Sequence, residues 1–186
     1  VQGLKAYKNI KDAPDDIDLV IVAIAARFVV ETLKICVDKN VKSCMIFSSG
    51  FAEMDEEGEQ LQNEIANIAR ESGMAIVGPN CQGIANFENR SVTSFSTAFV
   101  EGELVTGSSA ILSQSGAVAA MVYDMQIKQG TGIKYWASTG NEVDLNTAKL
   151  ANYILEEDDD VNVIQMYIES IRNTTDMIKL GEKSKE

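Results

Sequence analysis

Histidine is absent from the 186-residue sequence. Its absence excludes Ser-His-Asp triads and Cys-His pairs, and it removes the usual general base and the commonest metal ligand. Any chemistry that the chain supports must therefore come from backbone dipoles, from carboxylates or from a residue supplied from elsewhere.

Long apolar runs and paired cysteines are absent as well. The longest apolar run, Leu19 to Ala26, is far too short to cross a bilayer, and no charged and then apolar signal segment opens the chain. The three cysteines, Cys36, Cys44 and Cys81, have no C-x-x-C spacing, a pattern typical of reduced thiols rather than of a disulfide framework or a zinc site. We expect a cytoplasmic protein without a membrane segment or a bound metal.

Positive charge is scarce: 16 Lys and Arg stand against 28 Asp and Glu, a formal net charge of −12. Nucleic acids and anionic membranes attract basic surfaces, so neither is the expected partner, and an anionic ligand would need local compensation. The acidic run from Glu156 to Asp160 is interpreted as a solvated loop rather than a metal site. A hydrophobic content of 45% with only two prolines indicates a globular chain.

Apolar runs alternate with helical periodicity along the chain. Residues 18–25, 43–48 and 74–77 are predicted to be buried strands, and residues 27–40 and 55–73 amphipathic helices. This β-α-β-α-β order is typical of a doubly wound parallel sheet.

The pattern breaks after Asn86 and then restarts. Residues 87–109 are polar and punctuated by glycine, and we interpret them as a β-like excursion plus a linker. The later elements are predicted as strands over 110–112, 133–138 and 162–170 and as helices over 115–129, 143–157 and from about 174. We therefore expect two α/β units, over residues 1–97 and 98–186, joined near residues 97–108.

Ligands of open parallel sheets bind at the carboxyl ends of the strands, so the strand-to-helix turns are the candidate sites. Small residues there let the backbone approach a ligand closely. Five turns have this composition: "AIAARF" (23–28), "FSSGFAE" (47–53), "GPNCQGI" (78–84), "SQSGA" (113–117) and "STGNEVD" (138–144).

Each of these turns also allows a purely structural interpretation. "SQSGA" would direct free N–H groups and the positive end of a helix dipole at a phosphate, or it would merely supply a serine N-cap. "STGNEVD" is either a second anion loop or an ordinary turn. Cys81 is more consistent with buried filler than with a catalytic thiol. Glu169 is either a solvent-facing carboxylate at a strand end or an acid directed into the cleft near "SQSGA".

Six phrases in order, "GLKAYKNIKDAPDDIDLVIVAIAA", "IFSSGFAEMDEEG", "GPNCQGIAN", "SQSGAV", "STGNEVD" and "MYIESI", resemble the nucleoside-diphosphate-forming acyl-CoA synthetases. That family is related to the succinyl-CoA synthetase alpha subunit, and the resemblance runs across nearly the whole chain. It implies a Rossmann-like CoA-binding domain without its first strand, followed by an incomplete flavodoxin-like domain.

The resemblance also implies a reaction and partners. Acyl-CoA, phosphate and ADP or GDP would give the free small carboxylic acid, CoA and the nucleoside triphosphate, through an acyl phosphate and a phosphohistidine. An ATP-grasp domain or beta subunit would bind the nucleotide and magnesium, and the full-length protein would be an oligomer.

The family's site residues transfer onto matching positions. Glu169 is similar to the glutamate that holds the active histidine. CoA contacts are expected at Ala25, Ala26, Phe47, Ser48, Ser49 and Asn80. Phosphate contacts are expected at Ser113, Gln114, Ser115 and Gly116. Gly140 and Asn141 would flank the acyl or phosphate site.

Two family features have no counterpart here. The glycine-rich loop that closes on the CoA phosphates would precede Val1, and the active histidine would follow Glu186. A fragment of this kind is not expected to complete the reaction alone, and its first sheet is expected to expose an apolar edge.

Two other interpretations remain open. Similar domains without catalytic competence are fused to acyltransferases and sense a small ligand such as acyl-CoA. An ordinary dinucleotide-binding domain is disfavoured, because no G-x-G-x-x-G opens any predicted helix.

Overall fold

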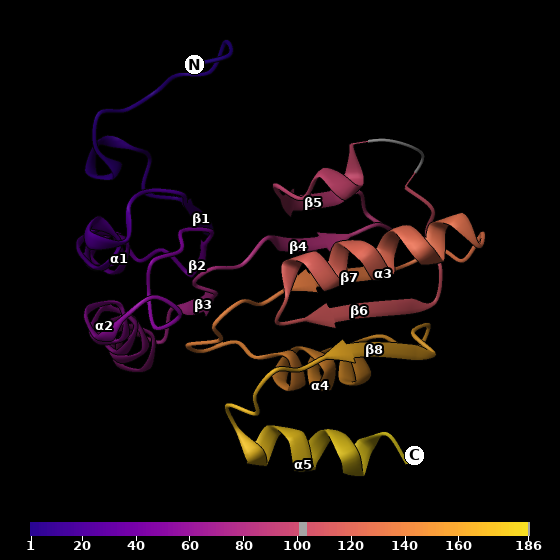
Figure 1. The fold of residues 1–186 in the computed structure, drawn as a ribbon. Helices are drawn as coiled ribbons and strands as arrows, with labels where there is room; N and C mark the ends of the chain where they lie inside the picture. Colours follow the sequence, from indigo (N-terminus) through magenta and orange to yellow (C-terminus); the bar gives the residue numbers. More distant parts are fainter. Residues whose placement is uncertain (101–103, 186) are drawn as a thin grey trace.

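The computed structural model describes residues 1–100 and 104–185, so part of the predicted linker, residues 101–103, lies outside the described residues. The first sheet is parallel and has the order β1-β2-β3, formed by β1 (Leu19–Val22), β2 (Ser43–Ile46) and β3 (Ala75–Val77). Helices α1 (Val29–Asp38) and α2 (Glu56–Ser72) pack together on one side of it (Figure 1). The predicted β-α-β-α-β order is confirmed.

The sequence signals at the ends of α2 act as expected. The Asp55 side chain accepts a hydrogen bond from the N–H of Gly58, and Gly73 ends the helix at φ 73°. On α1, Val29, Leu33 and Cys36 recur at helical spacing and are buried against the sheet. These local rules place the two helices without reference to the second sheet.

The second sheet has five strands in the order β5-β4-β7-β6-β8. Its strands are β4 (Gly83–Asn86), β5 (Ser91–Ser94), β6 (Ser109–Ser113), β7 (Tyr135–Ser138) and β8 (Val163–Tyr167). Strand β6 runs parallel to β7 and β8, whereas β4 is antiparallel to β5 and β7. The sheet is therefore a mixed one.

Helices cover both faces of this sheet. The helices are α3 (Gly116–Lys128), α4 (Thr147–Glu157) and α5 (Thr174–Lys183), and the short 3-10 turns of the chain are η1 (Ile10–Asp12), η2 (Ala26–Phe28) and η3 (Thr97–Phe99). Alternate residues of β6 face opposite ways: Ile111 packs in the cluster under α3, and Leu112 in the cluster under α4. Helix α5 packs on α4 (Figure 1). Within the described residues, no helix combines the length and apolarity needed to cross a membrane.

Two segments differ in detail from the sequence-based expectation. The excursion after residue 86 includes β5, which pairs with β4, and both strands belong to the second sheet although they precede residue 98. The predicted boundary between the two α/β units, at residues 97 and 98, stays a prediction. The helix expected over residues 143–157 begins only at Thr147, with Asn146 as its N-cap, because residues 141–145 are used in main-chain pairing.

This pairing joins the two sheets. The loop between β7 and α4 lies along the segment that leaves β3. Three main-chain bonds form it: Asn141 N to Pro79 O (2.9 Å), Val143 N to Gly78 O (3.0 Å) and Leu145 N to Ile76 O (3.1 Å). The Asp144 carboxylate adds a bond from the N–H of Ile76 at 2.9 Å. The carboxyl ends of β3 and β7 are thereby held side by side.

The first sheet exposes apolar side chains on β1. This strand is at one end of the sheet, and Leu19 and Ile21 on it, with Ile24 just beyond, are exposed. The exposed apolar edge expected from the sequence is confirmed.

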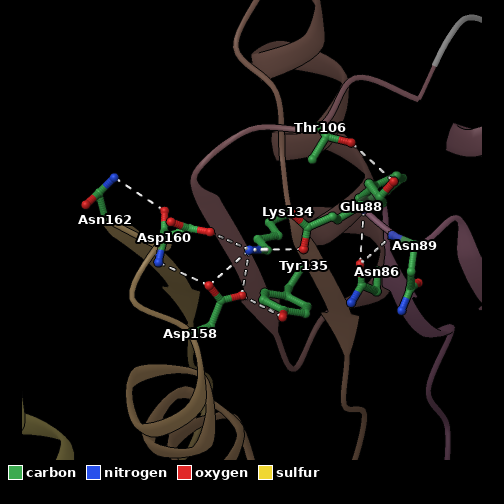
Figure 2. Close-up of polar contacts among 10 residues, drawn as sticks. Asn86, Glu88, Asn89, Thr106, Lys134, Tyr135, Asp158, Asp160 and Asn162 are labelled. Carbon is green, nitrogen blue, oxygen red and sulfur yellow. Dashed lines mark hydrogen bonds and ion pairs between the residues drawn. The ribbon is translucent and has the colours of Figure 1, made fainter.

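A buried lysine holds three segments of the second sheet together (Figure 2). Lys134 is 4% exposed, and its Nζ lies 2.9 Å from Asp158, 3.1 Å from Glu88 and 3.4 Å from Asp160. Hydrogen bonds from Lys134 and from Tyr135 lower the pKa of the Asp158 carboxyl. Burial and the bond to Asp158 raise the pKa of Tyr135 to about 12. The solvated loop expected over 156–160 is therefore wrong in two respects: Glu156 and Glu157 belong to α4, and Asp158 is largely buried.

Replacing Lys134 with Met should lower the melting temperature clearly more than replacing Lys179 with Met. The first change leaves Asp158 largely buried without its cation, whereas Lys179 forms a half-exposed pair with Glu156. Thermal unfolding followed by circular dichroism measures both. Equal melting temperatures for the two variants would show that the buried pair does not stabilise the sheet.

Candidate functional site

A polar cavity of about 400 Å³ lies at the carboxyl ends of both sheets. Its walls come from the segments that follow β2, β3, β5, β6, β7 and β8. The lining residues are Phe47, Ser49, Glu53, Asn80, Cys81, Gln82, Phe95, Gln114, Ser115, Gly116, Gly140, Asn141 and Glu169. Four of the five turns singled out from the sequence therefore meet in one place.

The N-terminus of α3 opens into this cavity. Ser115 is the N-cap, and its hydroxyl accepts a bond from the N–H of Val118 at 3.4 Å. No acceptor in the described part of the chain takes the N–H of Gly116 or of Ala117. Ser115 thus caps the helix and leaves two donors at the positive end of the helix dipole; that these donors bind phosphate stays a prediction.

Gly116 lies directly under the side chain of Gln82. A Cβ atom built on Gly116 would come within 2.4 Å of the Gln82 side chain. Any side chain at position 116 would therefore displace the Gln82 amide from the helix N-terminus or fill the space in front of it.

The Gln114 side chain has a complete set of protein partners. Its Nε2 donates to Glu142 Oε2 and to the carbonyl of Ser170, both at 2.7 Å. Its Oε1 accepts from the N–H groups of Glu169 at 2.7 Å and Ser170 at 3.0 Å. That Gln114 binds phosphate stays a prediction; in the structure its amide ties the end of β8 to the β6–α3 turn.

A second polar contact crosses between the two sheets. Glu53 accepts bonds from the N–H groups of Gly50 (2.7 Å) and Phe51 (3.2 Å), and from Asn141 Nδ2 at 2.6 Å. Burial acts to raise the pKa of Glu53, but these hydrogen bonds outweigh it and hold the pKa below its ordinary value. Asn141 also donates to Gln62 at 2.8 Å. The carboxylate is therefore charged at neutral pH and anchors the β7–α4 loop.

The remaining predicted site residues lie outside the cavity lining. Ala25 and Ala26 are at η2, where Ala26 packs against the first core. The Ser48 hydroxyl accepts from the N–H of Ile24 at 3.0 Å. Ser113 is buried, and its hydroxyl bonds to the main chain of Ser115. The CoA and phosphate roles of these four residues stay predictions.

Sequence reasoning did not select several residues that line the cavity. Glu53 and Gln82 stood inside quoted turn phrases, so their position was a usable signal. Phe95 lies after β5 and forms an edge-to-face pair with Phe47, with ring centroids 4.9 Å apart; no sequence signal identified it. Cys81 is 1% exposed, and burial raises the pKa of its thiol to about 12, consistent with buried filler.

The charge of the lining is one-sided. No Lys or Arg of the described chain lines the cavity, whereas Glu53 and Glu169 do. In the described part of the chain, no three Cys, Asp or Glu side chains are grouped so that they could hold a metal ion. The donors that the site offers to an anion are therefore backbone N–H groups and neutral side chains.

Two family models match the chain, one on each side of the cavity. A CoA-binding domain matches residues 1–86, and a succinyl-CoA ligase like flavodoxin domain matches residues 106–186. The chain carries a CoA-binding domain and a succinyl-CoA ligase-like domain. The resemblance deduced from the six phrases, and the predicted α/β fold, are confirmed.

Individual relatives of this succinyl-CoA ligase-like chain agree with the family models. The alpha subunit of ADP-forming acetate–CoA ligase II of Pyrococcus furiosus is 38% identical over 98% of this chain and 39% of its own length. The ADP-forming 4-hydroxybutyrate–CoA ligase of Nitrosopumilus maritimus is 32% identical over 95% of this chain and 25% of its own. The chain thus spans less than half of each relative.

A solved structure supports the same fold. The dinucleotide-forming acetyl-coenzyme A synthetase 1 of Ca. Korarchaeum cryptofilum, in complex with phosphate and ADP, is 27% identical. It superposes with a TM-score of 0.87 over 99% of this chain and 39% of its own.

Replacing Gly140 with Ala should disrupt the cavity much more than replacing Gly130 with Ala. Both glycines have positive φ, 64° and 74°, so both substitutions carry the same backbone strain of about 1 kcal/mol. A Cβ at Gly140 would also meet the carbonyl oxygen of Pro79 at 2.2 Å, whereas one at Gly130 would meet nothing within 4 Å.

Urea unfolding measures the stability of both variants, and amide spectra measure the pairing between residues 76–79 and 141–145. Equal losses of stability with this pairing intact in both would contradict the close packing of Gly140 on Pro79.

Proposed function

We propose that this chain is the CoA-binding and phosphate-binding part of an ADP-forming acid–CoA ligase. The observation that carries the proposal is the polar cavity between the two family domains, which brings the turns of the CoA-binding sheet opposite the N-terminus of α3. Relatives named as ADP-forming acetate–CoA and 4-hydroxybutyrate–CoA ligases support the reaction class.

The first sheet would hold CoA. Phe47, Ser49 and Asn80 line the cavity from the ends of β2 and β3, and the N–H of Asn80 is held by the carbonyl of Ser48 at 2.9 Å. An aromatic ring, a hydroxyl and an amide suit the mixed apolar and polar pantetheine arm of CoA. The thiol end of that arm would then point toward α3.

The helix N-terminus would hold the phosphoryl group. The free N–H groups of Gly116 and Ala117 and the dipole of α3 stabilise negative charge there. Gln82 lies over Gly116 and offers a side-chain amide to the same group. An acyl-CoA in the first half of the cavity and a phosphate at α3 would be placed for attack of a phosphate oxygen on the thioester carbonyl. That step gives an acyl phosphate and releases CoA thiolate.

The absence of a cation makes this a weak anion site on its own. Glu53 and Glu169 carry negative charge toward a phosphate that is already anionic, and only backbone and amide donors oppose them. This arrangement favours release of the phosphoryl group to an acceptor over its retention. In the proposed reaction the acceptor is a histidine outside this chain, and an ATP-grasp domain or beta subunit binds ADP and magnesium. The subunit name of the Pyrococcus relative supports such a partner.

Replacing Gly116 with Val should abolish phosphate binding and leave CoA affinity nearly unchanged. The branched side chain would fill the space in front of the helix N-terminus, whereas the CoA contacts lie on the other sheet. Isothermal titration of the wild-type and variant chains with CoA and with phosphate measures both affinities. Equal loss of both ligands would show that the two sites are not separate. A folded full-length wild-type protein that binds neither ligand would refute the proposed function.

Replacing Glu169 with Gln in the full-length ligase should slow formation of phosphohistidine without weakening CoA binding. The amide has the shape of the carboxylate but lacks the negative charge that would orient a histidine ring. Acid-labile phosphorylation from acyl-CoA and phosphate measures the rate, and titration with CoA is the control. A normal rate of phosphorylation would remove Glu169 from its assigned role.

A further inference from the structure

We infer that Glu142 is a positioning residue that acts through Gln114 to set the place of Glu169 in the cavity. The inference rests on the proposed function, in which Glu169 faces the reacting groups. Glu142 does not line the cavity and acts only through the Gln114 amide.

Glu142 is a buried carboxylate whose partners are all donors. It is 6% exposed; Oε1 accepts from the Thr139 hydroxyl at 2.7 Å and from the N–H of Thr147 at 2.8 Å, and Oε2 accepts from Gln114 Nε2 at 2.7 Å. No lysine or arginine of the described chain forms an ion pair with it. Its backbone has φ 58°, which is unfavourable for a residue with a side chain. Burial and backbone strain together indicate that this carboxylate serves a specific contact.

That contact determines which way the Gln114 amide faces. Because Glu142 only accepts, the NH₂ group of Gln114 must point toward it, and the same NH₂ reaches the carbonyl of Ser170. The carbonyl oxygen of Gln114 is then left to accept from the N–H groups of Glu169 and Ser170. Gln114 is 8% exposed, so water is not a ready substitute for these partners.

The consequence is a rigid path from the β7–α4 loop to the end of β8. The main-chain bond from Gln114 N to Tyr167 O, at 3.0 Å, adds to the hydrogen bonds that the Gln114 side-chain amide makes with residues 169 and 170. The Glu169 carboxylate has no hydrogen-bond partner in the described part of the chain, so the contacts with Gln114 hold the main chain of residue 169 and not its rotamer. Glu142 therefore sets the point at the edge of the cavity from which the Glu169 side chain extends.

Glu142→Gln is the decisive variant because, of the three hydrogen bonds that Glu142 accepts, it removes only the one from Gln114. The Oε1 atom of a glutamine can still accept from Thr139 and Thr147, but its NH₂ group would face the NH₂ of Gln114. Two donors in contact force Gln114 to rotate or withdraw, and the N–H of Glu169 loses its acceptor.

The double variant Glu142→Gln, Gln114→Glu reverses the polarity of the pair. The NH₂ at position 142 then donates to a carboxylate at position 114, which can accept from the N–H groups of Glu169 and Ser170. The bond to the Ser170 carbonyl is lost and a carboxylate oxygen faces that carbonyl oxygen instead, so the recovery is expected to be partial. A role confined to general stability of the loop would not produce recovery from a second substitution.

Asp144→Asn is the matched control. Asp144 belongs to the same loop, and its bonds go to the N–H of Ile76 and to Lys149, not to Gln114. Loosening the loop at Asp144 therefore separates a general effect on the loop from the specific path through Gln114.

Two measurements test the inference. Amide hydrogen exchange on the 186-residue chain reports the Glu169 N–H without any ligand, and steady-state kinetics of the full-length ligase report kcat and the KM for CoA. Glu142→Gln should lower protection of the Glu169 N–H by roughly tenfold and lower kcat with KM for CoA unchanged, and the double variant should recover part of both.

Unchanged protection or unchanged kcat in Glu142→Gln would overturn the inference, and so would an equal loss in Asp144→Asn. Failure of the proposed function has a different signature, because the folded full-length wild-type protein would then bind neither CoA nor phosphate whatever the exchange data show.

Discussion

The main-chain pairing of residues 141–145 with residues 76–79 is the contact on which the site depends. Without it, the cavity would have two walls on separate sheets and no fixed distance between them. The pairing uses backbone groups, so it requires close approach of two chains, and Gly140 permits this approach where a Cβ would meet the Pro79 carbonyl. The same loop then carries Asn141 to Glu53 and Glu142 to Gln114, so each side of the cavity is held from one segment.

Carboxylates act as acceptors throughout this molecule. Glu53 collects main-chain and amide donors, Glu142 collects a hydroxyl, a main-chain N–H and an amide, and Asp144 holds the N–H of Ile76. Asp158 differs from these carboxylates because its partner is a buried cation, Lys134 (Figure 2). Neutral donors satisfy a buried carboxylate while leaving its negative charge in place. Carboxylates therefore hold the walls of a cavity that is proposed to bind phosphate. Their negative charge opposes tight binding of the phosphoryl group and so favours its transfer.

Much of the fold and part of the site could be predicted from the sequence. Apolar runs predicted most of the strands, and Asp55 as N-cap and Gly73 as C-cap predicted the ends of α2. These signals depend only on neighbours in the chain. Nine residues predicted for the site line the cavity: eight lie in the quoted turns and the ninth, Glu169, at a strand end, and the family resemblance selected them. The roles of Glu142 and Gln114 could not be predicted. Glu142 bonds to Gln114, and Gln114 bonds to Ser170, and no local pattern connects residues that are so far apart in the chain. The predicted start of α4 at residue 143 is too early, because residues 143–145 form main-chain hydrogen bonds with the segment after β3 instead of a helix.

The sequence by itself determined the α/β class, the absence of histidine chemistry and the small-residue turns at strand ends, because all of these follow from composition and local periodicity. Only the tertiary structure decided that β4 and β5 join the second sheet, that four of the turns share one cavity, and that a buried glutamate controls the amide behind Glu169. The physical reason is that hydrogen-bond partners far apart in the chain are chosen by which backbone groups remain unpaired when the sheets come together.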